Sequence, residues 1–224
     1  MMHLLGIDTC GPTGSVAVAE FAEGRAEIIA QTELAGRTYA AGLIPAVDEL
    51  LKQRDIQLRD FGCIVVVHGP GSFTGVRVGL GAAKGLAEGA GIPVVAVSRL
   101  EVLAAKAGVP AAALDAHRHE LFLRIAHPGG ESFGLWEMLA GLEEMGRIAP
   151  PSRLALCDDP AAALVASIWP GVEQVRVDPP AAADALVLAS PAIVARNFAD
   201  VALLDGHYLR RSDAEIFGNS VLKL

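Results

Sequence analysis

"GPGSFTGVRVG", residues 69–79, follows the apolar run Ile64–Val67 and opens a stretch with eight glycines in Gly69–Gly91. The apolar run predicts a buried strand, and the residues after the first glycines predict a helix with Ser72 or Thr74 as its N-cap. A strand, a glycine turn and a helix also form loops that hold phosphates. The stretch therefore either binds a nucleotide or lets another segment pack closely against the chain.

The two common nucleotide-binding templates do not fit this stretch. A Walker A loop needs a lysine directly after its second glycine, and the spacings from Gly69 and Gly71 do not supply one. A dinucleotide fingerprint needs one residue fewer between Gly71 and Gly75, and an acid where the next strand ends in Ser98-Arg99. A dinucleotide-binding enzyme stays an alternative that a cofactor titration would test.

Glycines continue along the predicted helix. Each glycine inside a helix lowers its stability by about 0.5–1 kcal/mol relative to alanine. The spacings Gly75-x3-Gly79 and Gly81-x3-Gly85 remove side chains from two helical stripes. A surface without side chains lets a neighbouring backbone approach closely. We therefore expect this helix to pack closely against another element, either inside the fold or at an interface.

The composition indicates a compact protein with a full core. The chain has 224 residues, of which 52% are hydrophobic, and its net charge is −8. This balance argues against strong unaided binding of nucleic acid, because phosphate backbones need clustered lysines and arginines, and Arg210-Arg211 is the only adjacent basic pair. The sequence contains neither an apolar run of the roughly 20 residues that span a membrane nor a signal peptide, so we expect a cytoplasmic protein.

The order of the predicted elements repeats once along the chain. Three strands are followed by alternating helices and strands, and the same order restarts near Gly108–Pro110. We therefore expect two α/β lobes, residues 1–108 and 109–224, related by an internal duplication in which the second copy is less regular. The predicted strands are 4–9, 15–21, 27–34, 63–69, 92–98, 111–114, 120–126, 153–159 and 173–179, and the predicted helices are 37–53, 73–88, 99–107, 133–146, 161–168 and 182–200.

An acid and a hydroxyl stand at the first predicted turn. The segment Gly6-Ile7-Asp8-Thr9 leads through this turn into Ser15–Val18. In the actin-like ATPase and sugar kinase superfamily, a similar hairpin holds magnesium and nucleotide phosphates through backbone amides and the acid. Asp115 stands at the corresponding place of the second predicted lobe, so Asp8, Thr9 and Asp115 are candidate phosphate-loop residues.

Six blocks, in order along nearly the whole chain, closely resemble the TsaB family, also known as YeaZ, of tRNA threonylcarbamoyladenosine biosynthesis proteins. The most specific block is GPGSFTG-x-R-x-G. The blocks are LLGIDT with SVAV (4–18), LIPAVDELL (43–51), GPGSFTGVRVGLGAAKGLA (69–87), IPVVAVSRLEVLA (92–104), LDAHRHELF (114–122) and HYLRRSDAE (207–215).

The resemblance implies an actin-like (ASKHA) α/β fold with two lobes of mixed sheet and flanking helices, the second lobe reduced. It also implies a non-catalytic subunit, without a cofactor, in the formation of N6-threonylcarbamoyladenosine on tRNAs that read codons starting with A. In that pathway TsaC makes threonylcarbamoyl-AMP, TsaD transfers the threonylcarbamoyl group to tRNA, and the ATPase TsaE takes part. The TsaB family is regarded as the non-catalytic paralogue of TsaD.

The resemblance also places a partner surface on the helices around 43–51 and 73–89. TsaD would bind there, and a homodimer could form through the same surface. An exposed apolar face of this kind suits a protein partner. The residues expected at the surface are Leu43, Val47, Leu50, Gly75, Arg77, Gly79, Ala82 and Gly85.

Departures from the transferase pattern support an inactive partner. The transferase relative holds its metal with H-x3-H on a first-lobe helix, whereas residues 37–51 contain no histidine. In the second lobe, Ala116-His117 replaces the glycine that an ATPase has after Asp115, and Gly129-Gly130 indicates a hairpin turn rather than an adenosine loop. An active actin-like ATPase or phosphotransferase using the three phosphate-loop candidates stays the alternative.

Several polar residues have both a structural and a functional interpretation. His117 and His119 would share one face of a strand and could mimic a metal-ligand pair, but we expect surface residues of a hairpin and no metal. His68 is expected to cap or shape the turn that follows it. Ser72 and Ser98 are expected to cap helices, because the sequence shows no histidine and aspartate partners for the proteolysis once suggested for the family.

The three cysteines and two arginines are the last residues for which the sequence gives an expectation. Cys10, Cys63 and Cys157 are widely spaced, which predicts reduced thiols rather than a disulfide framework or a zinc site. Arg77 and Arg99 could pair with acids of a partner or of their own lobe, and both possibilities stay open.

Overall fold

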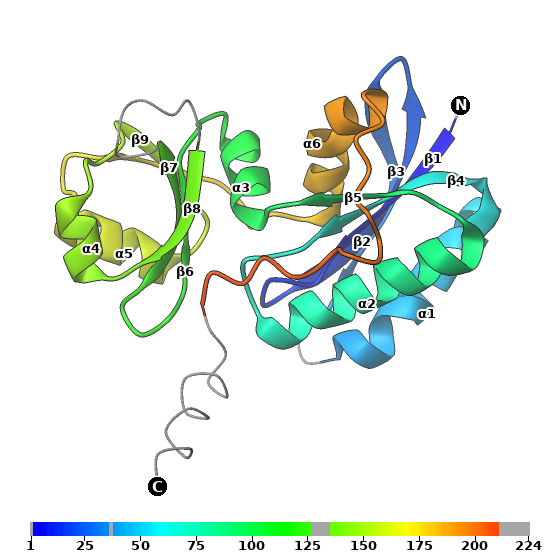
Figure 1. Cartoon of the computed structure of the whole chain (residues 1–224), viewed down its shortest axis with the longest axis horizontal. Helices are drawn as coiled ribbons and strands as arrows, with labels where there is room; N and C mark the ends of the chain where they lie inside the picture. The colour runs from blue at the N-terminus through cyan, green and yellow to red at the C-terminus, as the bar shows by residue number, and fades with distance from the viewer. Residues whose placement is uncertain (1, 36–37, 127–134, 211–224) are drawn as a thin grey trace, which may run out of the picture.

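The computed structural model describes residues 2–35, 38–126 and 135–210. Within them the chain forms two five-stranded sheets that lie side by side (Figure 1). The first half contains β1 (Met2–Asp8), β2 (Gly14–Ala22), β3 (Arg25–Leu34), α1 (Tyr39–Arg54), a 3₁₀ turn (Leu58–Asp60), β4 (Phe61–Val67), α2 (Phe73–Ala90), β5 (Val94–Val97) and α3 (Arg99–Ala107). The second half contains β6 (Ala112–Asp115), β7 (Leu121–Ala126), β8 (Leu135–Ala140), α4 (Leu142–Arg147), β9 (Arg153–Leu156), α5 (Asp159–Ile168), β10 (Glu173–Arg176) and α6 (Ala182–Val194).

The first sheet has the strand order β3-β2-β1-β4-β5. Its first three strands pair antiparallel as a meander, and β4 and β5 extend the sheet in parallel with β1. The central strands are covered on both faces, which explains why Leu4–Ile7 and Cys63–Val67 are nearly continuous apolar runs. At the carboxyl end of β1, Asp8 pairs with Ser15 of β2, and this end of the sheet carries the first candidate loop.

The second sheet repeats the first. Its order is β8-β7-β6-β9-β10, with β6, β7 and β8 antiparallel and β9 and β10 parallel to β6. Alternate side chains of β7 point to opposite faces of the sheet and belong to two hydrophobic cores. Leu121 and Leu123 pack with Met145 of α4, whereas Phe122 packs with Leu100 of α3. The expected duplication and the actin-like fold of two mixed sheets are confirmed.

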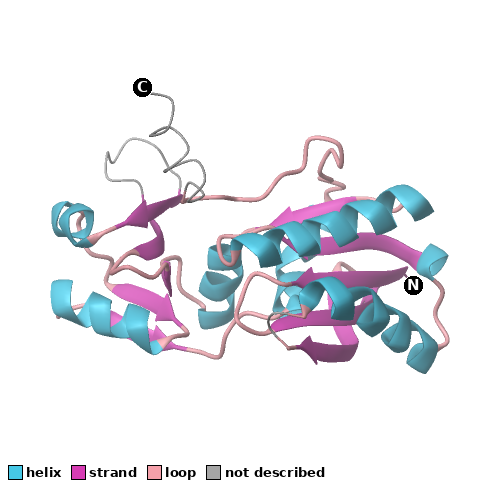
Figure 2. Ribbon diagram, turned by 90° about the horizontal axis from the view of Figure 1, so that it is seen from below, coloured by secondary structure: helices cyan, strands magenta, loops and turns pink. Residues whose placement is uncertain are grey.

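Each lobe is covered by helices on both faces (Figure 2). α1 and α2 lie on one face of the first sheet and α4 and α5 on one face of the second. Each of the remaining two helices packs on the sheet of the other half of the chain. α3 packs on β6, β7 and β9 of the second sheet. α6 packs on the first sheet and places Ala185, Leu186 and Ile193 in its core. The predicted lobe boundary at residue 108 stays a prediction. α3 lies before this residue but packs on the second sheet, and α6 lies after it but packs on the first sheet.

Several predicted helix boundaries agree with local chemistry. Ser72 caps α2, because its Oγ accepts a hydrogen bond from the backbone N–H of Gly75 at 3.3 Å. Ser98 caps α3 in the same way through the N–H of Leu100 at 3.2 Å. Gly91 ends α2 in the left-handed conformation, which glycine adopts without steric cost.

Two predicted helices are wrong in part. The segment 133–146 forms β8 and the short α4 rather than one helix. The spacing of its apolar residues is compatible with a helix or a strand. Residues 135–140 form a strand because they pair antiparallel with β7, with Met138 opposite Leu123. The helix predicted over 182–200 ends at Val194. Gly129-Gly130 and residues 211–215 of the last family block lie outside the described residues.

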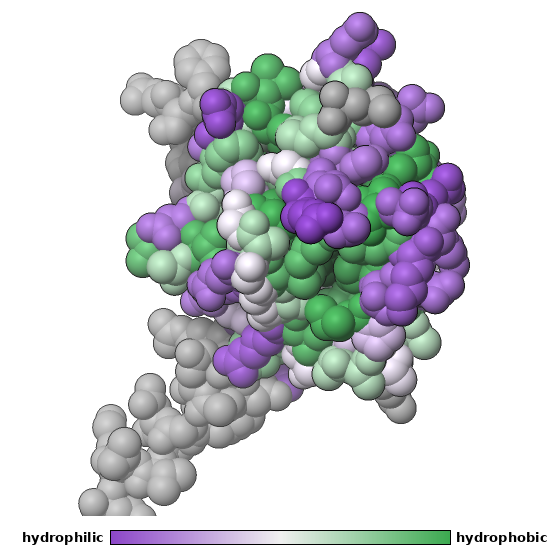
Figure 3. All heavy atoms as spheres, turned by 90° about the vertical axis from the view of Figure 1, so that its right-hand side faces the viewer, coloured by the Kyte–Doolittle hydropathy of each residue, from purple (hydrophilic) through white to green (hydrophobic). Residues whose placement is uncertain are grey.

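Hydrophobic residues are exposed among hydrophilic ones at the end of the first lobe (Figure 3). Ile44 of α1 is 48% exposed, whereas its neighbours Leu43 and Val47 are buried. Within residues 2–35, 38–126 and 135–210, every helix is too short or too polar to cross a membrane.

Candidate functional site

The turn between β1 and β2 is the first candidate phosphate loop. Asp8 is buried, and its Oδ1 accepts a hydrogen bond of 2.8 Å from the backbone N–H of Cys10. Burial raises the pKa of the Asp8 carboxyl, and the Arg99 guanidinium offsets part of that rise. The acid is therefore held inside the turn by its own chain rather than presented to solvent.

The start of α2 packs directly on this turn. Thr9 Oγ1 donates a hydrogen bond of 2.6 Å to the carbonyl oxygen of Gly75, and the N–H of Ser72 donates one of 2.8 Å to the carbonyl of Cys10. A Cβ on Gly75 would overlap the Thr9 carbonyl, and one on Gly79 would overlap the Thr9 hydroxyl. The close packing predicted from the glycines is confirmed for this stripe, and the element that packs on it belongs to the same chain.

Two further side chains fill the surroundings of the turn. Arg99, at the start of α3, is 6% exposed, and its guanidinium lies so close to Gly11 that a Cβ there would overlap it. Tyr39, at the start of α1, donates a hydrogen bond of 2.7 Å from its hydroxyl to the carbonyl of Gly11, and its ring covers Gly14. The turn that would hold phosphates in an actin-like ATPase is thus packed with the chain's own side chains.

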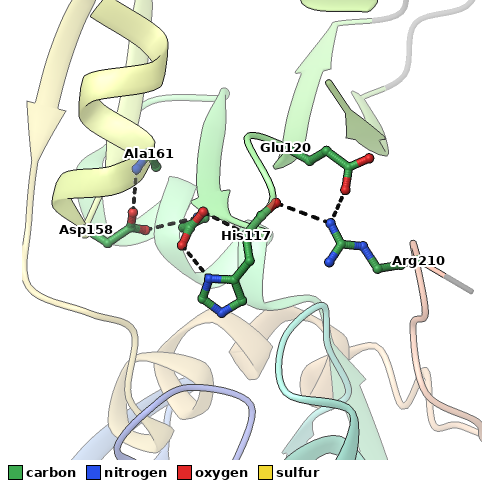
Figure 4. Close-up of polar contacts among 6 residues, drawn as sticks. His117, Glu120, Asp158, Ala161 and Arg210 are labelled. Carbon is green, nitrogen blue, oxygen red and sulfur yellow. Dashed lines mark hydrogen bonds and ion pairs between the residues drawn. The ribbon is translucent and has the colours of Figure 1, made fainter. Parts of the chain in front are cut away.

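The turn between β6 and β7 is the second candidate loop (Figure 4). Asp115 Oδ2 lies 2.8 Å from Nδ1 of His117, and Asp115 Oδ1 accepts a hydrogen bond of 2.9 Å from the backbone N–H of His117. Asp158 links this turn to α5, because its two oxygens accept hydrogen bonds from the N–H groups of Asp115 and Ala161 at 3.2 and 2.7 Å. Among the described residues, no group of three histidine, cysteine or acidic side chains could hold a metal.

The histidines of this turn lie in left-handed backbone rather than in a strand. His117, Arg118 and His119 have φ values of 60°, 57° and 61° and are exposed. The alternative in which His117 and His119 share one face of a strand does not hold, because three consecutive left-handed residues form the turn. Their assignment to the surface of a hairpin is confirmed. Arg210 closes the other side of the turn through an ion pair with Glu120 (Figure 4).

A polar cluster around Glu137 of β8, here called the Glu137 cluster, joins the two lobes. Glu137 Oε2 accepts a hydrogen bond of 2.6 Å from the Ser98 hydroxyl and lies 2.9 Å from Nε2 of His207. Its Oε1 accepts a hydrogen bond of 2.8 Å from Nη1 of Arg124. Burial raises the pKa of Glu137, but the contacts with His207, Ser98 and Arg124 outweigh burial, and the net pKa lies below the ordinary value.

The Glu137 cluster also assigns roles to His68 and Ser98. The His68 ring stacks on His207 with 5.4 Å between centroids, and its carbonyl accepts a hydrogen bond of 2.8 Å from the N–H of His207. Burial lowers the pKa of His68. The Ser98 hydroxyl donates to a carboxylate and not to an imidazole, so these residues do not form the pair of nucleophile and base that a serine peptidase needs.

The predicted partner surface divides into buried and exposed residues. Leu43, Val47 and Leu50 are 1%, 4% and 3% exposed in the first core, and Gly75 and Gly79 face the β1 turn. Their assignment to a partner surface is wrong, because the apolar stripe of each helix faces its own sheet.

The remaining three predicted surface residues are accessible. Arg77 and Gly85 are exposed on α2, and Ala82 is half-buried. A Cβ on Gly81, Gly85 or Gly89 would meet no atom of the described residues within 4 Å, so the second glycine stripe of α2 faces away from the chain's own core. We call Arg77, Gly81, Gly85 and Gly89 the outer stripe of α2.

Known proteins match the chain over different lengths. The family model "TsaD: tRNA N6-adenosine threonylcarbamoyltransferase" matches residues 25–129. The "tRNA threonylcarbamoyladenosine biosynthesis protein TsaB" of Haemophilus influenzae is 38% identical over 127 residues, 54% of this chain and 52% of that protein. Its Bacillus subtilis counterpart is 34% identical over 161 residues, 70% of this chain and 64% of that protein. The matched region therefore spans between half and two thirds of the length of these curated relatives.

A solved structure extends the match to nearly the whole of this chain. It is described as "an uncharacterized protein with similarity to peptidase YEAZ from Pseudomonas aeruginosa", is 30% identical, and superposes with a TM-score of 0.71 over 94% of this chain and 100% of that one. The chain belongs to the TsaB/YeaZ family. The resemblance of the sequence blocks is thereby confirmed, and the match to the TsaD model fits a family that is a paralogue of the transferase.

Sequence reasoning missed two features of this TsaB/YeaZ family member. Glu137 lies in a segment predicted as a helix, Arg124 is 13 positions before it and His207 is 70 positions after it, so no spacing indicates the Glu137 cluster. Arg99 is the cation beside Asp8. The sequence leaves open whether Arg99 pairs with an acid of its own lobe or with an acid of a partner.

Proposed function

We propose that this chain is a non-catalytic subunit in the formation of N6-threonylcarbamoyladenosine on tRNA and that it acts by binding the transferase TsaD. Membership of the TsaB/YeaZ family supports the pathway, since the curated relatives are named as biosynthesis proteins of this modification. The match of residues 25–129 to the transferase model supports a pairing of two similar first lobes. In this proposal TsaE joins the complex, and the site of action is the cytoplasm.

The packing of the β1 turn is the observation that carries the non-catalytic part of the proposal. An ATPase needs the backbone amides and the acid of this turn to be free for phosphates and a metal. Here Asp8 accepts from Cys10, Thr9 donates to Gly75, and Arg99 supplies the positive charge that a metal would otherwise supply. The turn therefore stabilises the junction of β1, α2 and α3 instead of holding a nucleotide.

The outer stripe of α2 is the proposed contact with TsaD. Gly81, Gly85 and Gly89 are spaced four residues apart, so they lie on one side of the helix, and no side chain of residues 2–35, 38–126 and 135–210 covers them. A partner helix can approach such a stripe closely and bury backbone and Cα atoms. Exposed Ile44 on the adjacent α1 adds apolar area. A homodimer through this stripe is the proposed state of the chain without TsaD.

Reconstituted modification tests the function. Unmodified tRNA, threonine, bicarbonate and ATP are incubated with TsaC, TsaD and TsaE, with or without this chain, and the modified nucleoside is measured by mass spectrometry. We expect product only when the chain is present. Asp115→Asn should leave the yield unchanged, because the Asp115 carboxylate pairs with His117 in a surface turn. Full yield without the chain would refute the proposal, and loss of product with a folded Asp115→Asn would favour the ATPase alternative.

A titration with magnesium and ATP addresses that alternative directly. An active actin-like ATPase using Asp8, Thr9 and Asp115 would bind the nucleotide tightly and turn it over without a partner. The packed β1 turn leads us to expect neither result from the pure chain. Turnover that disappears on Asp8→Asn would replace the scaffold proposal by the ATPase one.

A further inference from the structure

A groove lies between α2 and the segment that follows α6. This segment, residues 200–210, is here called the strap. It is fixed to the first lobe, since Lys84 Nζ donates a hydrogen bond of 2.9 Å to the carbonyl of Leu204 and the N–H of His207 donates one to His68. The groove between them has a volume of about 640 Å³ and is lined by Phe73, Arg77, Leu80, Lys84, Leu204, Asp205, Tyr208, Leu209 and Arg210.

Aromatic and aliphatic side chains line much of this groove. The rings of Phe73 and Tyr208 meet with 4.9 Å between centroids, and Tyr208 is 36% exposed. Leu204 and Leu209 line the groove from the strap. Surfaces of this kind bind apolar or aromatic side chains, and the exposed Tyr208 ring offers the kind of aromatic contact that is enriched at protein interfaces.

The charges at this groove have the opposite sign to the protein as a whole. The chain has 26 acidic and 18 basic residues, yet the groove is lined by three basic residues and one acid. Arg77 stacks on Phe73 at 3.8 Å and forms no ion pair with an acid of the described residues. Lys84 binds only a carbonyl there. Arg77 and Lys84 thus hold positive charge that the described part of the chain does not neutralise.

The spacing of these cations limits what could neutralise them. Arg77 and Lys84 are seven residues apart on α2, which is about 10 Å at 1.5 Å per residue. One carboxylate or phosphate group does not contact both in this arrangement, because the Arg77 guanidinium lies over Phe73, one turn before Arg77 and away from Lys84. An extended polypeptide advances about 3.1–3.4 Å per residue, so acids three residues apart reach both cations. The residues between those acids then lie over Leu80, and residues beside the acid at Arg77 lie over Phe73 and Tyr208.

We propose that this groove is the docking site for an acidic, extended segment of a partner protein. Two of its acids pair with Arg77 and Lys84, and apolar or aromatic residues beside and between these acids contact Phe73, Tyr208 and the leucines of the groove. Charge complementarity selects the segment, and the apolar lining supplies contact area. The site extends the outer stripe of α2 at Arg77 but does not depend on the proposed role in tRNA modification.

Fluorescence anisotropy with labelled peptides tests the site. The probe is four repeats of Glu-Ser-Phe, which places an acid at every third position, and its matched controls replace Glu by Gln or by Lys. We expect the Glu peptide to bind the full chain more tightly than either control and to weaken as salt rises. The double variant Arg77→Gln with Lys84→Gln should weaken binding about tenfold, as loss of two surface ion pairs implies. The hydrogen bond from the N–H of His207 to the His68 carbonyl does not involve either substituted residue and still holds the strap.

Lys52→Gln is the matched control variant, because Lys52 is an exposed lysine of α1 paired with Asp48 and remote from the groove lining. It should bind the Glu peptide like the unaltered chain. Equal affinity for the Glu, Gln and Lys peptides would overturn the proposal, as would undetectable binding of all three. Displacement of the probe by ATP or by oligouridylate at lower concentration than by unlabelled Glu peptide would also overturn it, in favour of a nucleotide or RNA.

Discussion

Replacement of Glu137 by glutamine should loosen the junction of the two lobes. The carboxylate is 9% exposed and contacts Ser98, Arg124 and His207 at 2.6, 2.8 and 2.9 Å. These partners come from the end of β5, from β7 and from the strap. Glutamine has nearly the same shape but only one acceptor oxygen and no charge, so the substitution removes the interactions without opening a cavity.

The magnitude follows from these contacts. A hydrogen bond to a charged group contributes about 1.5–3 kcal/mol and a neutral one about 0.5–1.5 kcal/mol. Breaking a fully buried ion pair costs about 3–5 kcal/mol, but Arg124 keeps Glu101 at 3.7 Å as a second acid. We therefore expect Glu137→Gln to lower the free energy of unfolding by about 2–3 kcal/mol. For a chain of this length the thermal midpoint should fall by roughly 4–12 °C.

The effect should also depend on pH. The folded-state pKa of Glu137 lies below the ordinary value of 4.5, so the carboxylate stabilises the fold above that pH. Its contribution is lost as the pH falls through the folded-state pKa. The difference in stability between the unaltered chain and Glu137→Gln should therefore be present near neutral pH and shrink below about pH 4.5.

Thermal and urea unfolding at several pH values measure this difference. Glu143→Gln is the control, because it removes a carboxylate from the same lobe where the ion pair with Arg147 is exposed, and it should change stability by less than about 0.5 kcal/mol. Equal stability of Glu137→Gln and Glu143→Gln at neutral pH would refute the reasoning. A difference between them that grows as the pH falls would also refute it, since the sign would be reversed.

Three further predictions concern packing, capping and the thiols. Gly75→Ala should destabilise the chain by about 1–3 kcal/mol because its Cβ overlaps the β1 turn, whereas Gly81→Ala should stabilise it by about 0.5–1 kcal/mol, both by urea unfolding. Ser72→Ala should cost about 1 kcal/mol through loss of the cap, with Ser72→Thr as the variant that retains it. Burial raises the pKa of Cys63 to about 12 and that of Cys10 well above its ordinary value, so a thiol reagent near pH 8 should modify both only as the chain unfolds. Rapid modification of both in the folded chain would contradict the last of these.

The glycine helix shows how far sequence reasoning reached. The spacing of its glycines correctly predicted close packing, but two stripes were available and only one faces the chain itself. Val76 and Leu80 are buried beside Gly75 and Gly79, so they show which side of the helix faces the core. A closer reading of the apolar stripe would have placed these glycines inside and Gly85 outside. The assignment of all of them to a partner surface ignored this rotation.

The Glu137 cluster shows why the rest could not be predicted. Its members are brought together by strand pairing and by the path of the strap, and 70 positions separate Glu137 from His207. Local propensity carries no information about such contacts. The duplication, in contrast, was visible in the order of strands and helices, because each lobe repeats local patterns. The exchange of α3 and α6 between lobes needed the three-dimensional packing.

The central claim is that the outer stripe of α2 binds TsaD. Light scattering of this chain mixed with TsaD should give the mass of a heterodimer, and Gly85→Leu should weaken the complex about 5- to 150-fold, as about 1–3 kcal/mol of overpacking at a helix crossing implies. Gly146→Leu is the matched control, because that glycine is also exposed on a helix and has no described atom within 4 Å of its Cβ, but lies in the second lobe. A folded Gly85→Leu chain that binds TsaD as tightly as Gly146→Leu would contradict the account.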